Sequence, residues 1–138
     1  MHGGAGEKGR GAMRESEVVE AFCAALRADG WGVRTEVEFV DVVAERDGRM
    51  LYAEAKGTTT SPGLDVDTMF GQLLRRMPTE QLKGVRFAVV VPENVLKAVQ
   101  RVPARVRALL GIDVYSVSDA GHVRLHESGD AAAWAPVG

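Results

Sequence analysis

The dipeptide Asp47-Gly48 constrains this chain more than any other feature, because it lies between two runs of strand-forming residues. The runs are residues 39–45 (FVDVVAE) and residues 50–56 (MLYAEAK). A two-residue turn at this place predicts an antiparallel hairpin in which the numbers of paired residues sum to 95. This register sets Asp41 directly opposite Glu54 and leaves Lys56 two residues further along the same face.

Carboxylates at directly opposite strand positions repel one another unless a cation lies between them. Asp41 and Glu54 therefore predict a divalent-metal site at one end of the hairpin. Alternatively, both are polar residues on a solvated face, and a three-residue turn would shift the register by one and move Asp41 to the other face. Val43 and Tyr52 favour the first interpretation, because they make the acidic face partly apolar, where ionisable groups need partners.

The order of an Asp, twelve residues and then Glu-x-Lys resembles the signature of the PD-(D/E)XK nuclease superfamily. The chain has Val40 where the family name has Pro. The similarity extends over roughly residues 14–117 and includes Gly71-Gln72-Leu73-Leu74, which resembles the glutamine motif of the restriction-endonuclease-like and Holliday-junction-resolvase-like branch. It implies a restriction-endonuclease-like α/β fold, in which helices flank both faces of a mixed β-sheet core.

The same resemblance implies the roles of the residues in this motif. Asp41, Glu54 and the backbone carbonyl of Ala55 would bind Mg²⁺, with Mn²⁺ able to substitute. Lys56 would lie beside the attacking water, where it either activates that water or stabilises charge on the phosphate.

Two further residues are candidates for the catalytic site. Glu15 belongs to a helix predicted over residues 14–28 and would approach a second metal or its water; alternatively, it is a first-turn glutamate favoured by the helix dipole. Gln72 resembles the family glutamine that orients water or contacts a phosphate, and the alternative is an ordinary exposed helical glutamine.

Charge is unevenly distributed along a chain whose formal net charge is −2. Residues 1–66 carry 8 basic and 12 acidic side chains, whereas residues 75–107 carry eight basic and two acidic ones. A basic half beside an acidic pocket would attract phosphates although the protein is not basic as a whole. Arg75 and Arg76, one turn beyond Gln72, are the candidate contacts to a nucleic-acid backbone; alternatively, they form a solvated helix face.

A single nuclease-like domain is predicted over residues 13–127, with a disordered glycine-rich tail at 1–12 and a loose tail at 128–138. Residues 57–67 have the composition of a mobile loop, and Asp67 is expected to cap a helix that stops at Pro78. The glycine inside that helix, Gly71, indicates either close packing against another backbone or a tolerated glycine. The buried face of the helix is expected to consist of Met69, Phe70, Leu73, Leu74 and Met77.

Later elements are expected to complete the sheet. Strands are predicted over 85–91, 112–117 and 122–126, and helical segments over 93–101 and between Pro103 and Gly111.

These features predict a Mg²⁺-dependent endonuclease that hydrolyses phosphodiester bonds in DNA. The alternative is a catalytically inactive nuclease-fold module that binds nucleic acid or a partner protein within a larger complex. A homodimer or a larger nuclease, defence or repair complex would suit either function. The sequence has no apolar run long enough to span a membrane, and its single cysteine, Cys23, fits a reducing compartment, so we expect a cytoplasmic protein without a membrane partner.

Overall fold

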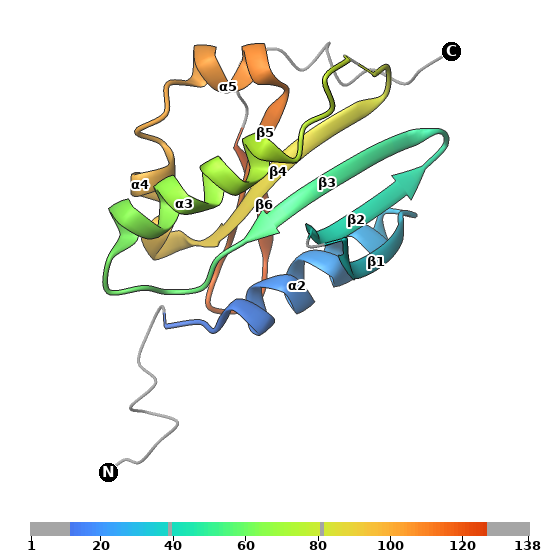
Figure 1. Cartoon of the computed structure of the whole chain (residues 1–138). Helices are drawn as coiled ribbons and strands as arrows, with labels where there is room; N and C mark the ends of the chain where they lie inside the picture. Colours follow the sequence, from blue (N-terminus) through green and yellow to red (C-terminus); the bar gives the residue numbers. More distant parts are fainter. Residues whose placement is uncertain (1–11, 39, 81, 127–138) are drawn as a thin grey trace.

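The computed structural model describes residues 12–38, 40–80 and 82–126 (Figure 1). The predicted tails at 1–12 and 128–138 lie outside these ranges, apart from Ala12. Within them, six strands form one sheet whose spatial order equals their order in the sequence. The strands are β1 (Gly32–Val37), β2 (Val40–Arg46), β3 (Arg49–Ala55), β4 (Val85–Pro92), β5 (Ile112–Val117) and β6 (Val123–His126).

The sheet is mixed, because the connections β3–β4 and β4–β5 contain helices, whereas a two-residue turn joins β2 to β3. The pairs β3–β4 and β4–β5 are parallel, and the other three pairs are antiparallel. The helical segments are α2 (Glu15–Ala28), α3 (Pro62–Arg75), the 3₁₀ turn η1 (Glu93–Val95), α4 (Leu96–Val99) and α5 (Ala104–Leu110). Figure 1 shows α2 on one face of the sheet and α3 and α5 on the other. The predicted mixed sheet with helices on both faces is confirmed.

Strand alternation divides the interior into two apolar clusters. In β3, Leu51, Ala53 and Ala55 pack against α2, whereas Tyr52 packs on the α3 side. Because successive side chains of a strand point to opposite faces, Glu54 is directed toward the α3 side as well.

The predicted hairpin register is confirmed. Backbone pairing runs from Arg46↔Arg49 to Val42↔Ala53, and the numbers of each pair sum to 95. Asp47 and Gly48 have φ angles of 51° and 80°, which are the positive values that a two-residue type I′ turn requires at both positions. The next step along the hairpin therefore brings Asp41 opposite Glu54.

The start of α3 differs from the prediction. The helix begins at Pro62 instead of after Asp67, because a proline at the first helical position loses no hydrogen bond and already has a helical φ. The residues wrongly assigned to the loop include Val66, which is buried. The buried face is consequently Val66, Met69, Phe70 and Leu73, whereas Leu74 is 44% exposed.

No described helix is long and apolar enough to cross a bilayer.

Candidate active site

Asp41 lies where β2 separates from β3. It still belongs to β2 through the pairing of that strand with β1, but the described pairing with β3 ends at Val42↔Ala53. Beyond that point, a side chain takes the place of a backbone carbonyl as the acceptor: Asp41 Oδ2 accepts a hydrogen bond of 2.8 Å from the Ala55 N–H. The carboxylate is therefore held beside the Ala55 peptide at the end of the hairpin.

Glu54 is the buried member of the acidic pair, with only 4% of its surface exposed. Its Oε2 accepts a hydrogen bond of 2.7 Å from Arg76 Nη1, which comes from the end of α3. Burial, followed by the negative charge of Asp41, raises the pKa of Glu54 from its usual 4.5 to about 7, although Arg76 acts in the opposite direction. The two carboxylates are thus close enough to disfavour simultaneous ionisation.

The first turn of α2 brings Glu15 to the same edge of the sheet. Partial burial raises the pKa of Glu15, the Asp41 charge raises it further, and the Lys56 ammonium lowers it. Glu15 also lines a hollow of about 380 Å³ together with Asp41. The sequence-predicted residues Glu15, Asp41, Glu54 and Lys56 therefore lie together in space.

The backbone of Lys56 is held against β4 at the end of β3. Its N–H donates a hydrogen bond of 3.1 Å to the Val90 carbonyl of β4, and its side chain is half-buried. Among residues 12–38, 40–80 and 82–126, no carboxylate forms an ion pair with its ammonium. The Lys56 charge is therefore available to a ligand at this edge.

The two residues after Lys56 join the loop to the start of α2. Thr58 donates its N–H to the Met13 carbonyl at 2.8 Å, and its Oγ1 accepts a bond of 2.9 Å from the Met13 N–H. A Cβ atom on Gly57 would lie 2.5 Å from the Glu15 backbone nitrogen and 2.7 Å from the Met13 carbonyl oxygen. Because Gly57 has no side chain, its backbone can lie against the backbone at the start of α2. This close approach brings Lys56 and Glu15 into one site.

The remaining predicted residues lie on α3, and the structure separates them. Gln72 is half-buried one turn before Arg76, and no hydrogen bond of its amide group is found within the described ranges. Arg75 is exposed, whereas Arg76 is paired with Glu54. Arg75 and Arg76 therefore do not form one free cationic pair as the sequence interpretation supposed.

Part of the basic segment 75–107 is also used inside the protein. Arg86 and Asp113 form a buried two-point ion pair, with bonds of 3.0 and 2.7 Å. Arg107 is buried and donates from Nε to the Val102 carbonyl. Of the eight basic residues in the segment, the exposed ones are Arg75, Lys83, Lys97, Arg101 and Arg105.

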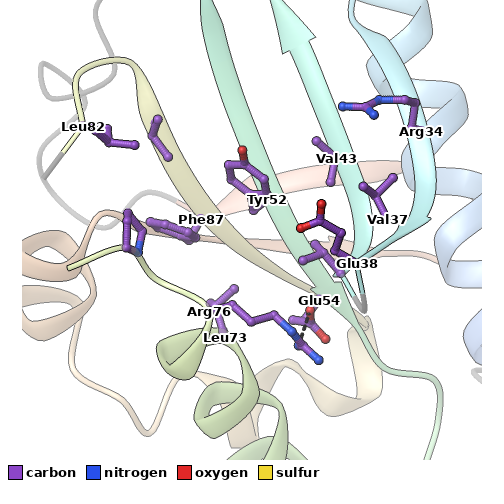
Figure 2. A pocket seen from close by; sticks show the side chains of 13 residues that line it. Arg34, Val37, Glu38, Val43, Tyr52, Glu54, Leu73, Arg76, Leu82 and Phe87 are labelled. Atoms are coloured by element: carbon purple, nitrogen blue, oxygen red, sulfur yellow. Dashed lines mark hydrogen bonds and ion pairs between the residues drawn. The ribbon is translucent and has the colours of Figure 1, made fainter. Parts of the chain in front are cut away.

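Sequence reasoning missed the contact between Arg76 and Glu54 and the pocket beside it. Arg76 lies three residues beyond Leu73 on the buried side of α3, at the C-cap of the helix, and this spacing is the signal that the sequence offered. The pocket has a volume of about 440 Å³ and includes Glu54, Arg76, Tyr52 and Phe87 in its lining (Figure 2).

The donor set fits a hard divalent cation held mainly by water. No three His, Cys, Asp or Glu side chains of the described part surround a common point. Asp41, Glu54 and the Ala55 carbonyl supply oxygen alone, and Mg²⁺ is commonly held by one or two carboxylates while it keeps several waters. The guanidinium of Arg76 supplies the positive charge next to Glu54 that a bound cation would otherwise supply.

Comparison with known proteins identifies similar folds. No protein-family model matches the chain, and no curated protein sequence matches it. An XisH family protein from Nostoc punctiforme has a TM-score of 0.54 at 19% identity, over 79% of this chain and 98% of that chain. An fdxN element excision controlling factor protein from Anabaena variabilis has a TM-score of 0.57 at 18% identity, over 80% and 98%. Similarity at this level of identity concerns the fold, which agrees with the mixed sheet described above.

Proposed function

We propose that this protein is a metal-dependent endonuclease of the PD-(D/E)XK type that hydrolyses phosphodiester bonds in DNA. The observation that carries the proposal is the acidic pair, Asp41 and Glu54, at the open end of the β2–β3 hairpin with the Lys56 ammonium beside it. A buried carboxylate next to a second carboxylate is costly for folding, so its presence favours a functional site.

Each group has a chemical role in this proposal. Asp41, Glu54 and the Ala55 carbonyl would hold Mg²⁺ or Mn²⁺, which supplies Lewis-acid stabilisation of the phosphate oxygens when it is bound. The Lys56 ammonium stabilises charge on the phosphate or lowers the pKa of the attacking water. Glu15, which lies near both Asp41 and Lys56, is placed to orient that water.

A second candidate function is a non-cutting module that binds nucleic acid or a partner protein. The contact between Glu54 and Arg76 favours it, because an arginine occupies one oxygen of a proposed metal ligand. The name of the Anabaena neighbour, an element excision controlling factor, is also compatible with control of excision by a protein that does not itself cut.

Nuclease assays separate the two functions. Purified protein is incubated with linear, nicked, single-stranded and branched DNA in Mg²⁺, Mn²⁺ or EDTA. We expect metal-dependent cleavage that Asp41→Asn abolishes and that Lys56→Ala lowers about 100-fold or more, the usual effect of removing a positioned catalytic group. Mn²⁺ binding, measured by calorimetry, should survive in Lys56→Ala and be lost in Asp41→Asn.

The contrary outcomes are equally specific. DNA binding without cleavage of any substrate supports the non-cutting module. Cleavage that persists unchanged in Asp41→Asn shows that the hairpin site is not the active site.

A further inference from the structure

The pocket of about 440 Å³ lies on the part of the α3 face that α3 does not cover. The apolar cluster beneath α3 draws its strand residues from β3, β4 and β5, and within the described ranges it includes none from β1 or β2. Val43 of β2 instead faces the pocket, opposite Tyr52 of β3. Because Glu54 is also part of the lining, the pocket and the acidic site share a wall.

Two stacked aromatic rings contribute to the wall of the pocket. The rings of Tyr52 and Phe87 lie with their centroids 5.9 Å apart and their planes inclined by 27°. Phe87 is only 8% exposed, whereas Tyr52 is half-buried and lines the pocket. An aromatic side chain in the wall of a pocket suits a planar heteroaromatic ring, since nucleobases stack on aromatic side chains irrespective of sequence.

The rim carries charges of both signs (Figure 2). Arg34 reaches the pocket from β1 and Arg76 from α3, and Glu38 enters from the turn between β1 and β2. Arg76 is paired with Glu54, so the exposed Arg34 is the cation that matches a phosphate beside the base. A carboxylate accepts hydrogen bonds from exocyclic amino groups, which adenine, cytosine and guanine have and thymine lacks.

We propose that this pocket binds one unstacked nucleobase of the strand whose phosphate is positioned at Asp41 and Glu54. The inference rests on the proposed function and specifies its substrate class as single-stranded or otherwise unpaired nucleic acid. A base within a duplex is stacked and paired, so it reaches such a pocket only at the cost of leaving the helix. Glu38 gives the pocket a preference for amino-bearing bases over thymine.

Binding of fluorescently labelled oligodeoxynucleotides in EDTA tests the pocket without cleavage. Tyr52→Leu removes the stacking surface and should weaken binding of single-stranded oligodeoxyadenylate about 10- to 100-fold. The matched variant Tyr52→Phe keeps the ring and should bind like the wild type. The affinity for a blunt hairpin duplex should be the same in all three proteins.

Two exposed rim residues provide variants that leave the fold intact if Tyr52→Leu is unstable. Glu38→Ala should reduce the preference for oligodeoxyadenylate over oligodeoxythymidylate. Arg34→Ala should weaken binding of both strands, whereas Arg124→Ala, which removes an exposed arginine from β6 at the other edge of the sheet, should change neither.

The inference is overturned if folded Tyr52→Leu binds single strands like the wild type, or if the rim variants do not change binding. It is also overturned if single-stranded and duplex oligonucleotides bind equally well. That result would indicate that the pocket takes an apolar group of a partner protein instead of a base. Failure of the proposed function looks different, because cleavage is then absent or insensitive to Asp41→Asn while base binding still depends on Tyr52.

Discussion

At the scale of single residues, Glu54 links the stability of the protein to pH. Burial and the Asp41 charge raise its pKa from 4.5 to about 7, so the folded protein binds the proton more tightly than the unfolded chain. Between these two values the native state holds more protons, and the free energy of unfolding falls as pH rises. The favourable contribution of protonated Glu54 is complete below pH 4.5 and is lost above about pH 7.

We therefore expect Glu54→Gln to be more stable than the wild type at pH 8 in metal-free buffer, by about 2 kcal/mol. The glutamine carries no charge to desolvate and still accepts a hydrogen bond from Arg76. The difference should shrink as pH falls toward 4.5, in urea unfolding followed across this range. Glu45→Gln, on the exposed part of the same hairpin, is the control and should show no such trend. A Glu54→Gln protein that is less stable than the wild type at pH 8 would contradict this account.

At the scale of secondary-structure elements, two glycines differ in whether the structure has room for a side chain. A Cβ atom on Gly71, in the middle of α3, would meet no atom within 4 Å, whereas a Cβ on Gly57 would meet backbone at 2.5 Å. Gly71→Ala should raise the free energy of unfolding by about 0.5 to 1 kcal/mol, because alanine loses less backbone entropy in a helix. Gly57→Ala should lower it by about 1 to 3 kcal/mol through overpacking.

Urea denaturation of the two alanine variants measures both changes in the free energy of unfolding. Gly57→Ala should also reduce cleavage of DNA, because the start of α2 must move away from Lys56 and carries Glu15 with it. If Gly57→Ala is as stable as the wild type, α2 and the loop are less tightly joined than described.

Elements set by local turn chemistry were predictable from the sequence. The hairpin follows from Asp47-Gly48, whose neighbours specify its register, and this register brought Asp41 and Glu54 together correctly. The start of α3 was not predictable from composition, because a Ser-Pro-Gly segment reads as a loop although proline is well suited to the first helical turn. That error also left Val66 out of the predicted buried face.

At the scale of the whole molecule, the alternation of strands and helices was sufficient to predict a mixed sheet with helices on both faces. Charge was harder to interpret, because a count along the sequence does not distinguish surface arginines from internal ones. Arg86 is buried in contact with Asp113, and Arg107 is buried in contact with the Val102 carbonyl. The sequence around each arginine does not indicate these partners. The cationic surface available to a nucleic acid is therefore smaller than the sequence indicated.

Two adjacent arginines offer a test of this distribution of charge. In EDTA, Arg75→Ala should flatten the log–log salt dependence of duplex DNA binding by about 0.9, the effect of one lost phosphate contact. Arg76→Ala should leave that slope nearly unchanged, because Arg76 is engaged by Glu54. Only Arg76→Ala should tighten Mn²⁺ binding in calorimetry at pH 8, by about tenfold, since it removes a charged competitor for the carboxylate. Equal behaviour of the two variants in both measurements would contradict the assignment.

The ion pair between Arg76 and Glu54 also has a consequence for folding in the absence of metal. The buried carboxylate acquires a positive partner from its own chain as soon as α3 docks on the sheet. We therefore expect the protein to fold without a metal, so that preparation in the presence of chelators should yield folded material. Binding of the proposed metal would then be a separate step that follows folding.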